Sequence, residues 1–107
     1  MKPAEVEKED IDEHLINEIE MYLYNDVIEG KEKIIDICET PIGNIGAKFV
    51  AEAVSECEGL EEIRLSNCGI KDDGALALFD KLKTNHTVNI LDLNFNSLSE
   101  KCFDGLI

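Results

Sequence analysis

The stretch LEEIRLSNCGIKDDGALALFDKLKTN, which runs from Leu60 to Asn85, changes its hydrophobic period near its middle. Its first half alternates apolar and polar residues, as a short strand with one buried face does. Its second half repeats small or apolar residues every four positions, at Gly74, Leu78 and Leu82, as one face of a helix does. The stretch therefore predicts one unit of strand, turn and helix.

The same residue types recur 28 positions earlier and 28 positions later, without an insertion. Ile37, Leu65 and Leu93, for example, stand at equivalent places. Two places break the pattern, because Thr40 stands where Cys68 and Asn96 stand, and Cys102 stands where Gly46 and Gly74 stand. A fixed period of this length is typical of a repeat protein, in which neighbouring units share one continuous core. We expect the repeats to span residues 32–107, in units at 32–59, 60–87 and 88–107, the last of which ends inside its helix.

These units resemble leucine-rich repeats of the ribonuclease-inhibitor type, whose long repeats read LxxLxLxx(N/C)xLxxxGxxxLxxxLxxN. The stretch quoted above matches nearly every apolar position of this pattern, and VNILDLNFNSL matches its strand half. The resemblance implies an α/β fold, a leucine-rich repeat solenoid that forms a short right-handed βα horseshoe with its parallel strands on the concave side. It also implies that Thr40, Cys68 and Asn96 stand at the turn, where a small polar side chain bonds to neighbouring backbone groups.

In this geometry, the side chains that flank each buried strand position face the hollow of the horseshoe. They are Ile34, Asp36, Cys38, Glu62, Arg64, Ser66, Ile90, Asp92 and Asn94. Because this set mixes apolar side chains with acids around a single arginine, we expect it to bind a protein with a basic or mixed surface. The alternative is that these residues are only solvated strand positions.

The segment before the repeats differs from them in composition. Residues 1–9, MKPAEVEKE, combine a proline with dense charge and predict a disordered tail. Residues 10–31 predict a capping helix that Gly30 can end, because their apolar residues form a helical stripe: Ile11, Leu15, Ile19, Tyr22 and Leu23. Such a helix would cover the open edge of the first repeat, although an acidic helix is also suited to docking a basic partner.

An acidic helix that runs into repeats of uniform length resembles the start of the C-terminal domain of tropomodulin and leiomodin. DIDEHLINEIE would be the leading helix, and ALALFDKLKTNHTVNILDLNFNSLS resembles the family's helix and next strand. The resemblance implies actin binding at the slow-growing filament end, and no single contact residue can be carried over. The alternative function is that of a GTPase-activating regulator of the Ran GTPase-activating protein type, which uses similar repeats.

Charge excludes several classes of partner. The chain has 107 residues, a net charge of −14 and a pI near 4.3, so it offers no basic surface for nucleic acid or for an anionic membrane. Its apolar runs are too short to span a bilayer, and its acidic start is unlike a signal peptide. No serine or cysteine lies in a recognisable nucleophile motif. We therefore predict a cytoplasmic protein-binding module that is not an enzyme and uses no cofactor.

The candidate metal ligands are poorly placed for a metal. The four cysteines contain no CxxC pair, so free thiols are expected. DLNFNS, from Asp92 to Ser97, begins like a calcium loop, but serine replaces the turn glycine and Phe103 replaces the bidentate glutamate. The sequence therefore predicts no metal site.

The repeat register also predicts the core and the end of the solenoid. Leu65 and Leu93 are expected to be buried between sheet and helices, and the side chain of Asn96 is expected to face inward. Because the third unit is incomplete, its strand would present an open edge. The edge suggests a fragment of a longer repeat protein, an edge-mediated homodimer, or a partner that supplies the next layer.

Overall fold

The structure is a computed structural model that describes residues 12–106. The predicted tail, residues 1–9, and Ile11 of the predicted stripe lie outside the described residues. In chain order, the elements are α2 (Glu13–Met21), η1 (Tyr22–Glu29), β1 (Ile34–Asp36), α3 (Gly43–Glu56), β2 (Glu62–Arg64), α4 (Asp72–Leu82), β3 (Ile90–Asp92) and η2 (Glu100–Leu106).

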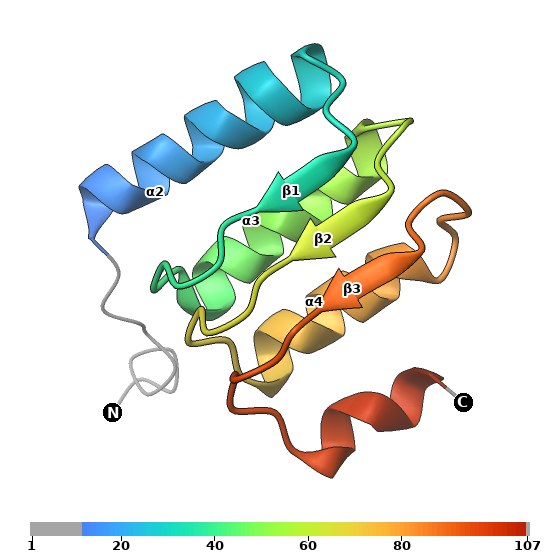
Figure 1. Cartoon of the computed structure of the whole chain (residues 1–107). Helices are drawn as coiled ribbons and strands as arrows, with labels where there is room; N and C mark the ends of the chain where they lie inside the picture. The colour runs from blue at the N-terminus through green and yellow to red at the C-terminus, as the bar shows by residue number, and fades with distance from the viewer. Residues whose placement is uncertain (1–11, 107) are drawn as a thin grey trace, which may run out of the picture.

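The three strands form one parallel sheet in the order β1-β2-β3 (Figure 1). Ile35 pairs with Ile63, and Ile63 pairs with Leu91, so each strand is displaced from the next by 28 residues. Backbone hydrogen bonds continue beyond the strands, where the Leu65 N–H donates to the Asp92 carbonyl at 2.8 Å. The predicted register of strand, turn and helix is therefore confirmed.

Helices α3 and α4 lie side by side behind the sheet, and η2 continues this layer (Figure 1). The core fills the space between the two layers, and its largest fully buried side chains include Ile35, Ile42, Leu60, Ile63, Leu65, Ile70 and Leu78. Ile35 and Ile63 alternate with exposed or partly buried neighbours along their strands, as a sheet with one covered face requires. The helices supply the second half of the core through the four-residue spacing seen in the sequence.

Leu65 is fully buried, as the repeat register predicted, but Leu93 is only partly buried. The prediction for Leu93 was wrong because β3 is the last strand of the described sheet and pairs only with β2. A residue at this position needs a repeat on both sides to be fully enclosed.

Polar side chains tie the start of one helix to the next repeat. Asn44 Oδ1 accepts hydrogen bonds from the Lys71 N–H at 2.8 Å and from the Gly74 N–H at 3.0 Å. A Cβ atom at Gly74 would lie 2.7 Å from Asn44 Oδ1, so glycine is needed for this approach. One repeat later, Asp72 Oδ1 accepts from the Ser99 N–H at 2.7 Å, and Ser99 Oγ donates to Asp72 Oδ2.

The segment before β1 is an α-helix, α2, that passes directly into the π-helix η1. Asp12 caps its start by accepting a hydrogen bond from the His14 N–H at 2.9 Å. The change from α to π geometry was not predicted. Gly30 follows the last helical residue, as expected, but it keeps a right-handed φ of −77°, and the left-handed residue is Lys31.

We predict that Leu65→Ala lowers the free energy of unfolding by about 2–5 kcal/mol, because the substitution leaves a cavity in the closed part of the core. Leu93→Ala is the matched control and should cost less, since Leu93 is partly exposed. Urea denaturation of both variants measures the difference. Equal midpoints for the Leu65 variant and the wild-type protein would contradict the described core.

The Asp72 contact predicts a specific dependence of stability on pH. Hydrogen bonds from the Ser99 hydroxyl and N–H lower the pKa of Asp72 below its ordinary value of 3.8. A depressed pKa in the folded state stabilises the protein above the unfolded pKa, and this contribution is lost as the pH falls through the folded pKa.

The unfolding free energy of Asp72→Asn should therefore approach that of the wild-type protein as the pH is lowered below about 4. Asp73→Asn, at the exposed neighbouring position, is the control. Chemical denaturation at a series of acidic pH values measures both. A constant difference between wild type and Asp72→Asn across the series would refute the assignment.

Candidate protein-binding face

Six of the nine residues predicted to face the hollow belong to the strands and flank the central residue that faces the core, and the other three follow the strand ends. They can be described as three rows that run across the strands. The rows are Ile34, Glu62 and Ile90; Asp36, Arg64 and Asp92; and Cys38, Ser66 and Asn94. Neighbours within a row belong to adjacent parallel strands, about 4.8 Å apart. We call this surface the concave face.

The first row exposes two large apolar side chains. Ile34 is 43% exposed and Ile90 is 49% exposed, although both belong to strands whose central residue faces the core. Glu62 stands between them and is partly buried. Two isoleucines are thus held two strands apart on a polar surface.

The second row alternates in charge. Arg64 pairs with Glu62 of its own strand through Nε and Oε2, and this hydrogen bond is the main cause of a raised Arg64 pKa. Asp36 and Asp92 lie on either side of Arg64 in the register. Each has one carboxylate oxygen fixed by a backbone N–H two residues later, at 3.1 Å for Asp36 and 2.9 Å for Asp92. Because Glu62 neutralises Arg64, the row has an excess of negative charge.

The third row lies beyond the strands and is less distinctive. Cys38 and Ser66 are partly buried, whereas Asn94 is exposed. Burial is the main cause that raises the pKa of the Cys38 thiol, so this thiol is less readily ionised than an ordinary cysteine. The row therefore provides neutral polar contacts.

The residues assigned to the turn share one hydrogen-bonding pattern. Thr40, Cys68 and Asn96 each donate to the carbonyl two residues earlier. Cys68 also reaches the previous repeat, where its thiol donates to the Ile37 carbonyl at 3.0 Å. In the same way, the Asn96 amide donates to the Leu65 carbonyl at 2.8 Å.

Asn96 makes a second set of contacts that Thr40 and Cys68 do not supply. Its Oδ1 accepts from the N–H groups of Cys68 and Ile70, both at 2.9 Å. In a calcium loop, the Asn96 side-chain oxygen of DLNFNS would be a ligand, but here it accepts hydrogen bonds from the backbone of the previous repeat. Within residues 12–106, no group of three or more His, Cys, Asp or Glu side chains is placed to hold a metal ion.

Two features of the face were not found in the sequence. Glu39, Asn67 and Phe95 occupy equivalent places just before the turn position, and all have positive φ values, between 53° and 62°. Only Asn67 is a residue that signals this conformation. The conformation leaves Phe95 84% exposed beside Asn94.

The second missed feature is the role of Tyr22. The sequence placed this residue on the apolar stripe of the helix, but its hydroxyl donates to the Ile34 carbonyl at 3.5 Å and accepts from the Asp36 N–H at 3.3 Å. A single side chain thus replaces part of a neighbouring strand at the edge of β1. Burial is the largest cause that raises the Tyr22 pKa, and nearby carboxylates raise it further.

Among the described residues the four cysteines form no disulfide, and Cys57, Cys68 and Cys102 are buried. Among the described residues, no helix is long and apolar enough to cross a membrane.

No protein-family model matches the chain. It is 38% identical over 73 residues to the centrosomal protein of 78 kDa from Homo sapiens, which covers 68% of this chain and 11% of that protein. It is 33% identical over 67 residues to the human NACHT, LRR and PYD domains-containing protein 13, which covers 62% of this chain and 6% of that protein. The chain thus spans only a small part of these curated relatives.

Among solved structures, the chain is similar to leiomodin-1 actin-binding site 2, with a TM-score of 0.68 and 23% identity over 81% of this chain and 50% of that chain. At this identity the likeness shows the fold. The predicted fold, a short leucine-rich repeat horseshoe preceded by a helix, is confirmed, as is the resemblance to leucine-rich repeat proteins.

We predict that Asn96→Ala lowers the free energy of unfolding by about 1–3 kcal/mol, because it leaves backbone groups of two repeats without partners. Asn94→Ala removes the same side chain at an exposed position and should have little effect. Urea denaturation compares the two. If both variants unfold at the wild-type midpoint, the Asn96 contacts do not hold the repeats together.

Proposed function

We propose that the chain is a non-catalytic module that binds a protein partner through its concave face. The observation that carries this proposal is the exposure of Ile34 and Ile90 at equivalent positions in the first and third repeats. Burying two such side chains against a partner contributes about 25 cal/mol per Å² of apolar surface removed from water. Apolar groups surrounded by polar ones are typical of protein interfaces.

The charge of the second row indicates the chemistry of the partner. Asp36 and Asp92 take part in no ion pair among residues 12–106, and each has only one oxygen bound to a backbone N–H. They lie two strand spacings apart, roughly 10 Å, with Arg64 between them. A partner with basic residues at this spacing, or with a basic or mixed surface in general, would complement the row.

Actin is the first partner to test. Leiomodin-1, whose fold this chain shares, has a segment named actin-binding site 2, and the sequence independently resembles the tropomodulin and leiomodin domain. We also infer a cytoplasmic location, in keeping with the centrosomal name of one relative. Pairing of two chains through the free edge of β3 stays a prediction.

The binding experiment is co-sedimentation of the chain with actin filaments, together with a fluorescence assay for monomeric actin. Asp36→Lys combined with Asp92→Lys should weaken binding at least about tenfold, or about 1.4 kcal/mol. The matched control is Asp73→Lys combined with Asp80→Lys, which makes the same change of charge at two exposed positions of α4.

If the wild-type chain does not bind actin, the actin proposal is wrong, and the same variants are applied to a partner captured from a cell extract. Unchanged affinity in all concave-face variants would move the interface to the helices. An equal loss in the double variant of α4 would show that only total charge matters.

A further inference from the structure

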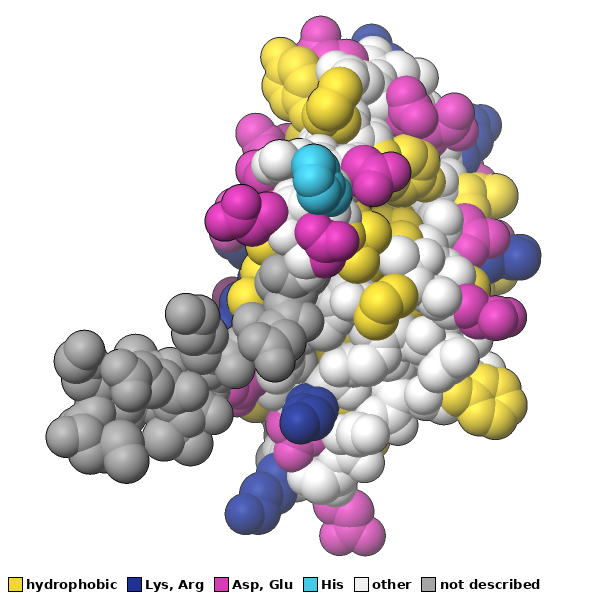
Figure 2. All heavy atoms as spheres, turned by 90° about the vertical axis from the view of Figure 1, so that its left-hand side faces the viewer, with side chains coloured by type: hydrophobic (Ala, Val, Ile, Leu, Met, Phe, Trp, Pro, Cys, Tyr) yellow, Lys and Arg dark blue, Asp and Glu magenta, His cyan; other side chains and the backbone are white. Residues whose placement is uncertain are grey.

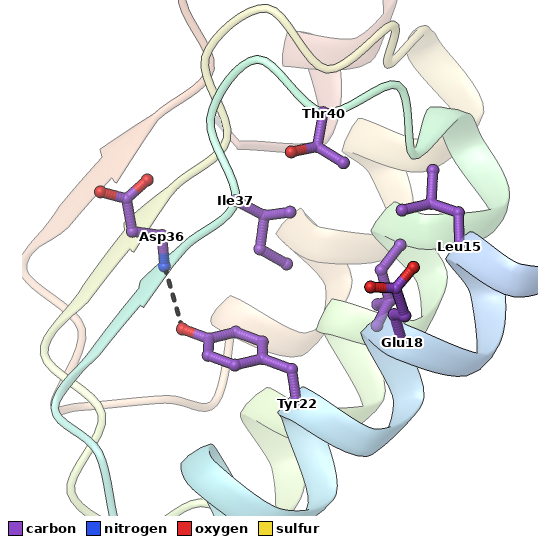
Figure 3. Close-up of a pocket in the computed structure, with 7 residues that line it drawn as sticks. Leu15, Glu18, Tyr22, Asp36, Ile37 and Thr40 are labelled. Carbon is purple, nitrogen blue, oxygen red and sulfur yellow. Dashed lines mark hydrogen bonds between the residues drawn. The ribbon is translucent and has the colours of Figure 1, made fainter.

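A pocket opens between the N-terminal helix and the segment that follows β1 (Figure 3). Its volume is about 230 Å³, and it is lined by Leu15, Glu18, Ile19, Tyr22, Asp36, Ile37 and Thr40. The Tyr22 hydroxyl bonds to Ile34 and Asp36 and so holds the helix against β1 at one end of the pocket. The space between the helix and the segment after β1 is large enough for one long side chain.

The walls of the pocket are largely apolar. Leu15 and Ile37 are partly exposed and point toward each other across the opening, and the ring of Tyr22 closes its inner end (Figure 3). Ile19 is buried beneath them. These groups can contact the methylene stem of a long side chain but supply no charge.

The charge of the pocket comes mainly from Glu18, because the carboxylate of Asp36 points away from Tyr22 (Figure 3). Glu18 is exposed and lies between Leu15 and Tyr22 on the helix that forms one wall of the pocket (Figure 3). Among residues 12–106, neither Glu18 nor Asp36 forms an ion pair, and no Lys or Arg lines the pocket. The surrounding side of the molecule, seen in Figure 2, shows hydrophobic side chains between acidic ones.

The pKa of Tyr22 is raised mainly by burial, and the carboxylates of Glu32, Asp36 and Asp26 raise it further. Burial disfavours any charge, so only the contribution of the carboxylates favours a cation beside the ring.

We propose that this pocket is an anchoring site for one arginine side chain of the partner that binds the concave face. The methylene stem lies between Leu15 and Ile37, and the guanidinium group stacks against Tyr22 and pairs with Glu18. Arginine fits better than lysine because its planar, weakly hydrated head can stack on an aromatic ring and bond to a carboxylate at once.

The pocket is continuous with the concave face through Asp36, which lines the pocket and also belongs to the second row. In Figure 3 the Asp36 carboxylate points away from Tyr22, whereas its N–H points to the Tyr22 hydroxyl. One residue thus serves both surfaces. This inference rests on the proposed function only in naming the partner as the source of the arginine.

The test uses the whole ¹⁵N-labelled chain and three small probes: N-acetyl-arginine amide, N-acetyl-citrulline amide and N-acetyl-norleucine amide. Citrulline keeps the shape of arginine without its charge, and norleucine keeps only the stem. In NMR titrations, arginine should shift the amide signals of Leu15, Tyr22 and Ile37, and both other probes should bind at least about fivefold more weakly.

Two variants assign the charge. Glu18→Gln should weaken binding of the arginine probe at least about fivefold, whereas Glu20→Gln, at an exposed position of the same helix outside the pocket, should not. Asp92 lies two strands away from the pocket, so Asp92→Lys should leave the affinity for the arginine probe unchanged. The pocket proposal can therefore fail or succeed independently of the concave face.

Equal binding of arginine, citrulline and norleucine would overturn the proposal in favour of a purely apolar pocket. Shifts outside the pocket, or none, would overturn it altogether. If the probe binds but Glu18→Gln leaves the affinity for the partner unchanged, the partner does not use the pocket.

Discussion

The hydrogen bonds that Asn96 and Cys68 make to the preceding repeat are the constraint on which the structure depends. Each side chain reaches a carbonyl 31 residues earlier, Leu65 for Asn96 and Ile37 for Cys68. Parallel strands joined through helices cannot use tight hairpins, so their register must be fixed elsewhere. These turn contacts fix it, and they keep the rows of the concave face aligned.

The same construction leaves backbone groups unpaired at each end of the sheet. At β1, the hydroxyl of Tyr22 supplies a donor and an acceptor in place of a neighbouring strand. At β3, which pairs only with β2 among the described residues, Leu91 and Leu93 remain partly exposed. Tyr22 also lines the pocket beside β1, so the residue that covers the first edge of the sheet is part of the pocket wall.

Much of the fold could be predicted from the sequence because a repeat with a constant length applies the same rule several times. The spacing of Ile35, Ile63 and Leu91 determined the strands, their register and the composition of the concave face. The burial of Leu93 was mispredicted, since the pattern treats every repeat as an interior one. The hydroxyl contacts of Tyr22 were not predictable from periodicity, which says only that the residue faces the repeats. The left-handed conformation of Phe95 was also missed, because the surrounding turn imposes it against the preference of the side chain.

The central claim is that the partner binds the concave face, and methyl NMR tests it most directly. With the isoleucine δ-methyl groups labelled, cross-saturation from an unlabelled partner reports which isoleucines touch it. Ile34 and Ile90 lie on the concave face, whereas Ile28 lies in η1 and is partly buried. The account predicts strong loss of signal at Ile34 and Ile90 and little at Ile28. Saturation of Ile28 with Ile34 and Ile90 unaffected would contradict it.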